Sequence, residues 1–332
     1  MTTTVPALVR ACALGGLLAS MSVLAACSPP GTDASGHGDP DVPLRVGPLN
    51  TQNTLTLAAA STRLEDTVRE TGGAVSLGSP FPAFAPAAEA MAADRIDMTT
   101  GSSTSLVAAL QGDPDLVVFA VEDNDNDTQG IVAAPGTGID SVRDLAGRSV
   151  AINEGGTGEY LLRQALTQEG MSIDEVEPVH LPPAEAATAF AGGQIDAWAT
   201  WDQYLVSAQN ADGATLVTVA ADIEATNPTV HVVARDFLDA RPDLVRAAYR
   251  ALEEQAEAVV AEPQLLARAY IEAGADPEIA RQVAAKTPPS IGPADEQFRA
   301  ELQHVADFYR QQGLTSSVTD VGDAVVDVAE LP

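Results

Sequence analysis

Hydrophobic and polar positions follow the same order twice along the chain, and this internal repeat predicts two related α/β units. In the first unit, apolar runs at 44–47 and 74–77 predict two short strands, with a polar loop and a helix over 55–70 between them. An Ala-rich helix is expected over 85–93. A short break follows it, and a third strand is expected to open at Ile96.

The second unit has the same order of elements. Strands are expected at 149–152 and 176–181, and the leucines and alanines of 158–168 have the spacing of a helix between them. A second Ala-rich helix is expected over 183–190, and two glycines end it before a strand that opens at Ile195.

Each unit is a β-α-β-α-β arrangement, which predicts an α/β fold of two lobes, each a mainly parallel sheet flanked by helices. A ligand is expected at the carboxyl ends of the strands, in the cleft between the lobes. The C-terminal segment is expected to be mostly helical and to pack back on a lobe, with helices over 243–261, 263–273, 277–285 and 295–312.

The first 27 residues have the pattern of a signal peptide. Arg10 precedes an apolar run from Ala11 to Ala26 that is too short to span a bilayer comfortably. The run ends in Leu-Ala-Ala before Cys27 and resembles the bacterial lipobox, so we expect a lipoprotein signal peptide at 1–26 and a lipid on Cys27. A Gly-, Pro- and Ser-rich stretch predicts a flexible tether over 27–42. The alternative is an ordinary secretory signal followed by a chance cysteine.

Composition narrows the function. The chain has 47 acidic and 17 basic residues and a formal net charge of −30, which argues against a nucleic-acid partner. Its two cysteines, Cys12 and Cys27, lie in the leader region, so no disulfide is expected in the fold. No metal or cofactor is expected either, since the histidines lack metal-ligand spacing; they are His37, His180, His231 and His304.

Three stretches, 150–163, 181–185 and 193–204, carry a family resemblance. The last contains Asp-Ala-Trp-Ala-Thr-Trp-Asp-Gln-Tyr and is the most specific. Together they resemble the nitrate/sulfonate/taurine family of ABC-importer solute-binding proteins, most closely the aliphatic-sulfonate-binding lipoproteins. The resemblance implies the type II periplasmic-binding fold, in which the chain crosses between lobes near 122–128 and returns near 227–229.

The resemblance also implies domain boundaries and partners. Lobe 1 would comprise 43–127 plus 229–332, and lobe 2 would comprise 128–228. The protein would be a monomer outside the cytoplasmic membrane, anchored by the lipid on Cys27. It would capture a small alkanesulfonate or taurine-like solute and deliver it to the permease and ATPase subunits of an importer.

Two expected helix N-termini could hold a sulfonate, because free N–H groups and the helix dipole favour an anion there. Ordinary helix capping is the alternative at both. Polar or aromatic residues after other strands complete the candidate site. The candidate ligand-binding residues are Gln52, Asn53, Thr100, Gly101, Ser102, Ser103, Gly155, Gly156, Thr157, Gly158, Trp201, Asp202, Tyr204 and Thr229. Phe81 and Phe84 either wall the cleft or belong to the core.

Several acidic residues depart from the family pattern. Glu154 stands where many sulfonate-binding members have a basic residue, and Glu159 follows closely. A zwitterion with its ammonium near Glu154, Glu159 or Asp202 is therefore open, as is a neutral ligand. The acidic run 122–127 is expected to be a solvated hinge; as a calcium loop it would lack the required glycine, since Thr128 stands there.

Other functions remain open on the same fold. They are binding of nitrate, binding of a neutral or heterocyclic solute such as a thiamine-precursor pyrimidine, an enzyme of the thiamine-precursor or menaquinone type, and a surface protein without a transport role. The chain has no G-x-S-x-G elbow and no plausible cysteine nucleophile, so no catalytic residue is expected.

Overall fold

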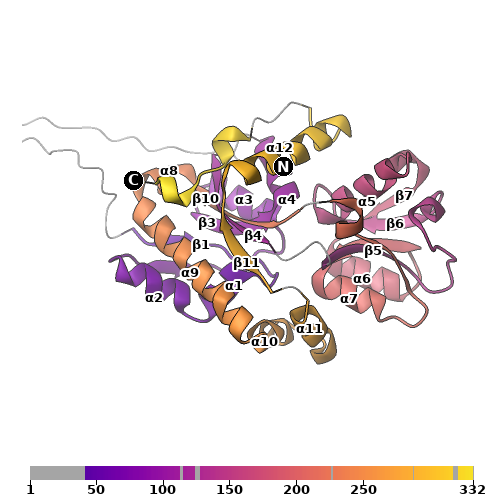
Figure 1. Ribbon diagram of the computed structural model, residues 1–332, viewed down its shortest axis with the longest axis horizontal. Helices are drawn as coiled ribbons and strands as arrows, with labels where there is room; N and C mark the ends of the chain where they lie inside the picture. Colours follow the sequence, from indigo (N-terminus) through magenta and orange to yellow (C-terminus); the bar gives the residue numbers. More distant parts are fainter. Residues whose placement is uncertain are drawn as a thin grey trace, which may run out of the picture. The chain divides into compact units, whose positions relative to one another are not determined.

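The computed structural model describes residues 42–112, 115–123, 128–225, 227–286, 288–316 and 321–331. Cys27, the expected signal peptide and the tether as far as residue 41 lie outside these ranges. The described residues form two β-sheets with helices packed against them (Figure 1). Within these ranges no helix combines the length and the apolar character needed to cross a membrane.

The first sheet has six strands in the order β11-β4-β10-β3-β1-β2. Parallel pairing joins β2 to β1 and β1 to β3, whereas β10 runs antiparallel between β3 and β4, and β11 is antiparallel to β4. The strands are β1 (Leu44–Val46), β2 (Val75–Leu77), β3 (Met98–Ser102), β4 (Leu116–Asp123), β10 (Thr229–Ala234) and β11 (Ser290–Pro293).

The second sheet has five strands in the order β7-β6-β8-β5-β9. Here β6 is parallel to β7 and β8, and β5 runs antiparallel between β8 and β9. The strands are β5 (Gln129–Ala133), β6 (Ser149–Ile152), β7 (Glu177–His180), β8 (Ala197–Trp201) and β9 (Thr215–Val219).

In each sheet the internal antiparallel strand, β10 in the first and β5 in the second, is the strand that the chain forms immediately after it crosses over from the other sheet. Strand β4 ends in the first sheet at Asp123, and β5 begins in the second sheet at Gln129. The chain returns after β9, and β10 enters the first sheet at Thr229. The predicted α/β fold class, two sheets flanked by helices, is confirmed; each sheet contains antiparallel as well as parallel pairings, although most of its strands run in the same direction.

Helices cover both faces of the first sheet. Leu44, Val46 and Met98 pack on one side with α1, α2 and α9, and Val118 and Val230 pack on the other with α3, α4 and α12. The helices of the chain are α1 (Thr54–Ala60), α2 (Arg63–Glu70), α3 (Phe84–Ala92), α4 (Ser103–Leu110), α5 (Thr157–Gln168), α6 (Pro183–Ala191), α7 (Asp202–Gln209), α8 (Arg235–Ala240), α9 (Pro242–Ala261), α10 (Gln264–Glu272), α11 (Pro277–Ala284) and α12 (Glu296–Gln311).

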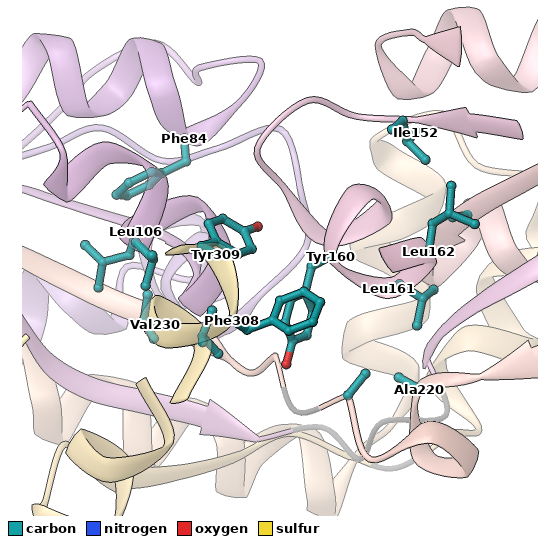
Figure 2. Packing of buried hydrophobic residues seen from close by; sticks show 14 of the residues in the cluster. Phe84, Leu106, Ile152, Tyr160, Leu161, Leu162, Ala220, Val230, Phe308 and Tyr309 are labelled. Carbon is teal, nitrogen blue, oxygen red and sulfur yellow. The ribbon is translucent and has the colours of Figure 1, made fainter. Parts of the chain in front are cut away.

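One apolar cluster includes residues of both sheets. Figure 2 shows Tyr160 of α5, which follows a strand of the second sheet, beside Phe308 and Tyr309 of α12. The rings of Tyr160 and Phe308 meet edge to face with centroids 5.5 Å apart. Aromatic pairs in this geometry attract beyond their buried area, so this cluster holds α5 against α12.

Two elements differ from the sequence-based expectation. The helix expected over 55–70 is split into α1 and α2, because Thr62 adopts a left-handed conformation with φ of 64°. Strand β11 lies in a segment expected to be helical or irregular; it adds to the edge of the first sheet beside β4. Its four residues include Gly292 and Pro293, which carry little strand propensity.

Candidate ligand-binding site

A cavity of about 30 Å³ lies where residues from the ends of both sheets meet the C-terminal helices. It contains three of the sequence-predicted residues, Gln52, Asn53 and Asp202. The other lining residues were not predicted as ligand contacts; they are Thr54, Leu57, Glu122, Thr128, Val259, Leu266, Tyr270, Val283 and Pro289. The volume is close to that of one water molecule in the liquid, so a whole solute requires the cavity to open.

On the first-sheet side, the cavity is built around the start of α1. Asn53 caps this helix, accepting a hydrogen bond from the Thr56 N–H at 3.0 Å. Glu122 Oε2 accepts from the Thr54 N–H at 3.0 Å and from its hydroxyl at 2.6 Å. His231 Nε2 lies 3.1 Å from the same carboxylate oxygen.

The expectation of a solvated hinge is wrong for Glu122. This side chain is the penultimate residue of β4 and is only 3% exposed, because α1 and β10 enclose it. A buried carboxylate needs donors, and Thr54 and His231 provide the contacts. Asp123, the next acid of the run, is exposed. The acids at positions 125 and 127 lie outside the described residues.

On the second-sheet side, Asp202 opens α7 with a left-handed φ of 46°. Burial, together with the negative charge of Glu122, raises the pKa of Asp202 to about 7. Lys286, Thr128 and Tyr270 lower this pKa more weakly. Asp202 therefore carries a proton for part of the time near neutral pH.

Two uncharged groups face Asp202. The Tyr270 hydroxyl of α10 donates to the carboxylate, and burial together with the charges of Asp202 and Glu122 raises the pKa of Tyr270 well above its ordinary value. The Thr128 hydroxyl is buried, lines the cavity and has no hydrogen-bond partner within 3.5 Å in the described chain. It lies near enough to Asp202 to lower the pKa of the acid.

The first predicted helix N-terminus begins later than expected. Thr100 and Gly101 belong to β3, where the Thr100 hydroxyl donates to the Val230 carbonyl and Phe84 fills the space beside Gly101. Helix α4 begins at Ser103 and is capped by Ser102. Phe84 is thus a core residue at 4% exposure, whereas Phe81 is a partly buried residue that packs against the same apolar cluster.

The first three N–H groups of α4 all have partners in the protein. Ser103 donates to the Pro228 carbonyl at 3.1 Å, Thr104 to Asn227 Oδ1 at 3.1 Å, and Ser105 to Ser102 Oγ at 3.3 Å. An anion could use this terminus only if the return crossing, which supplies Asn227 and Pro228, moved away.

The second predicted N-terminus, that of α5, is closely packed. A Cβ on Gly156 would lie 1.9 Å from Asn153 Nδ2, and one on Gly158 would lie 2.5 Å from the Ala199 carbonyl oxygen. The Gly158 N–H donates to Asn153 Oδ1 at 2.8 Å. These glycines therefore admit the Asn153 side chain and strand β8, a packing role that exists whether or not a solute binds.

The two acids near this terminus differ from one another. Glu159 is 3% exposed; it accepts from the Gly155 N–H at 2.9 Å and is paired with Arg163 at 2.7 Å. Because this internal ion pair already neutralises Glu159, a ligand ammonium would gain little there. Glu154 is exposed to solvent.

Asn227 brings the two helix N-termini together. Besides accepting from Thr104, its amide donates to Thr157 Oγ1 at 3.0 Å and to Gln129 Oε1 at 3.3 Å. Thr229, two residues later, pairs with Ser102 on one side and with Glu122 on the other. Neighbouring strands are about 4.8 Å apart, so Thr229 joins the α4 terminus to the cavity.

Trp201 and Tyr204 belong to an aromatic group in the second sheet. Trp201 meets Tyr204 edge to face at 6.4 Å, and Tyr204 lies 5.7 Å from Trp198. Both residues are half-buried. They border Asp202 along the chain, although neither lines the cavity.

Sequence reasoning missed Tyr270, His231 and Lys286. No local pattern marks Tyr270, which reaches the cavity because α10 and α11 pack against α7 through Val206 and Val283. Lys286 is the single lysine of the chain, and this was the one signal in the sequence that could have drawn attention to it. It follows α11 and lies near enough to Asp202 to lower the pKa of that acid. Among the described residues, no group of three or more His, Cys, Asp or Glu side chains is arranged to hold a metal ion.

Residues 71–265, more than half of the chain, match the protein family described as NMT1/THI5 like. A protein of Escherichia coli (strain K12) named for the binding of aliphatic sulfonates is 28% identical over 262 residues, covering 76% of this chain and 79% of that protein. The taurine-binding periplasmic protein of the same strain is 28% identical over 204 residues, covering 60% of this chain and 62% of that protein.

A solved structure has the same architecture. The periplasmic aliphatic sulphonate binding protein SsuA from Escherichia coli superposes with a TM-score of 0.77 and 26% identity, over 86% of this chain and 92% of that chain. The resemblance to sulfonate-binding importer proteins is thereby confirmed, as is the periplasmic-binding fold.

Proposed function

We propose, from the premise that this chain belongs to the NMT1/THI5-like family, that it is the solute-binding component of an ABC importer. It would work outside the cytoplasmic membrane, capturing a small sulfonate and delivering it to the permease. The observation that carries this proposal is the cavity, because it is lined by Glu122 of the first sheet, by Asp202 directly after a strand of the second sheet, and by Thr128 of the crossing between them. Relatives named for sulfonate binding at 26–28% identity support the solute class.

The proposed mechanism is closure of two lobes around the solute. Lobe 1 comprises 43–127 plus 229–332, and lobe 2 comprises 128–228. Reversible capture requires hydrogen-bond donors and apolar walls rather than a nucleophile, so the protein is proposed to be a binding protein and not an enzyme. We place the solute between the predicted residues of the two lobes. The first three N–H groups of α4 and the Gly158 N–H of α5 have partners in the protein, so a sulfonate at either helix terminus would replace some of these contacts.

The proposed location rests on the N-terminal sequence. A lipid on Cys27, after removal of residues 1–26, would anchor the monomer, and the tether over 27–42 would let it reach the permease. One lipid chain alone binds a membrane weakly, but a diacylated cysteine supplies two.

Calorimetry of the purified mature protein tests the function. We expect ethanesulfonate or taurine to bind with one-to-one stoichiometry and to raise the melting temperature by mass action. Nitrate and a hydroxymethylpyrimidine are the comparison solutes. Binding of one of these, with no binding of either sulfonate, would replace the sulfonate assignment by one of the other solute classes.

A further inference from the structure

We propose that the cavity between Glu122 and Asp202 is an ammonium subsite, so that the preferred solute is a zwitterionic amino-sulfonate rather than a plain alkanesulfonate. This inference rests on the proposed function and specifies its substrate class. The sulfonate would be held elsewhere in the cleft, and the amine would enter the space that these two carboxylates border.

The geometry places acceptors from both sides of the cleft around one small space. Glu122 comes from β4 in the first sheet, and Asp202 comes from the start of α7 beside the second sheet. The Thr128 hydroxyl, which is 5% exposed and has no hydrogen-bond partner within 3.5 Å among the described residues, also lines the space. An ammonium group has three donors and no acceptor, which matches two carboxylates and one hydroxyl.

The size of the space fits the group proposed. At about 30 Å³ it has room for one water molecule, and a primary ammonium is of similar size. The methylene and sulfonate parts of the solute are larger than this space and must lie outside it, in the cleft that the two lobes close around. The apolar side chains of Leu57, Leu266 and Val283 line the cavity together with the carboxylates.

The charge balance also favours a cation. The titratable groups facing Asp202 are Glu122 on β4, Tyr270 on α10 and Lys286 after α11, and His231 on β10 contacts Glu122. Two buried carboxylates repel each other, and despite Lys286 the pKa of Asp202 stays at about 7. An ammonium can take the place of the proton that Asp202 holds. Binding then converts neutral Asp202 to its carboxylate and releases that proton to solvent.

The other acidic candidates are weaker. Arg163 already neutralises Glu159 at 2.7 Å, so a second cation there would gain little. Glu154 is exposed, and water screens the attraction of an exposed carboxylate. The cavity pair combines two carboxylates, burial and an unsatisfied hydroxyl.

The test compares taurine with 1-propanesulfonate, in which a methyl group replaces the ammonium at nearly the same size. Calorimetry of the wild-type protein at pH 7 should give at least tenfold tighter binding of taurine. Asp202→Asn and Glu122→Gln should each reduce this preference at least tenfold, whereas 1-propanesulfonate affinity changes little. Asp174→Asn, at an exposed acid of the second half, is the matched control and should leave both affinities unchanged.

A second measurement uses only the wild-type protein, in case a cavity variant does not fold. Taurine binding at pH 7 should release protons, seen as a buffer-dependent enthalpy, and 1-propanesulfonate binding should release none. Equal affinity for the two solutes, or equal loss of both in Asp202→Asn, would overturn the ammonium subsite while leaving the sulfonate function standing. Failure of both solutes to bind the wild-type protein would overturn the function and the subsite together.

Discussion

Thr54 donates two hydrogen bonds to one oxygen of Glu122, from its backbone N–H at 3.0 Å and from its hydroxyl at 2.6 Å. The first residue of α1 is thereby tied to the strand from which the chain crosses to the second sheet. Because the carboxylate is buried, these contacts are required to keep it in the fold. They also orient Glu122 toward the cavity.

Thr54→Ala should destabilise the protein by about 1–3 kcal/mol, because it leaves a buried carboxylate without its closest donor. Urea unfolding of the two proteins measures the difference. Thr188→Ala is the control, since Thr188 is exposed on α6 and its hydroxyl donates to the Ala184 carbonyl one turn earlier on the same helix. The control should change the free energy of unfolding by less than about 0.5 kcal/mol. Equal effects of the two substitutions would show that the Glu122 contact is not stabilising.

Asp202 should make stability depend on pH in a definite direction. Its pKa is about 7 in the fold against 3.8 for the ordinary side chain, so the folded state binds more protons between these values. The carboxylate therefore costs stability progressively as pH rises from about 4 to 7, and the full cost is present above 7.

Asp202→Asn removes this cost. The variant should gain on the order of 2–4 kcal/mol relative to the wild type between pH 4 and pH 8, and the gain should level off above the folded pKa. Unfolding curves of both proteins at several pH values measure the difference in their free energies of unfolding. The titrations of all other groups are common to both proteins and cancel in this difference. A difference that stayed constant across this range would mean that Asp202 titrates normally.

Arg163→Met should be strongly destabilising, by about 3–5 kcal/mol, because Glu159 would remain buried without its partner. The side chains of this pair are 12% and 4% exposed. Arg281→Met is the matched control, since its partner Glu278 lies three residues earlier on α11 and the pair is 63% and 60% exposed. An exposed pair contributes about 1 kcal/mol or less. If both variants lost the same stability, burial would not be what makes the first pair important.

Cys27→Ala should abolish the expected membrane attachment without affecting solute binding. The lipid would be lost, and the protein should move from the membrane fraction to the soluble or culture fraction. Cys12→Ala is the control, because this cysteine lies inside the expected signal peptide and would be removed with it. Full retention of the Cys27 variant in the membrane fraction would contradict the lipoprotein hypothesis.

The repeat of apolar and polar positions was sufficient to predict most elements of both sheets. The helix expected over 158–168 is observed as Thr157–Gln168, and the strand at 149–152 is observed at those residues. Local spacing carries this information because each element buries one face, and burial of a face imposes a period of two or 3.6 residues. The break at Thr62 was missed because a single left-handed residue leaves little trace in that period.

The sequence by itself therefore determined the class of fold, the likeness to importer binding proteins and the strand ends near which the candidate residues lie. Only the tertiary structure decided which of these residues meet. Gln52, Asn53 and Asp202 share a cavity with Tyr270, although more than 200 residues separate Tyr270 from Asn53 along the chain. Glu122, expected in solvent, is enclosed because α1 and β10 pack over it. The physical reason is that charge state and burial depend on neighbours in space, and a pattern along the chain records only which face of each element is apolar.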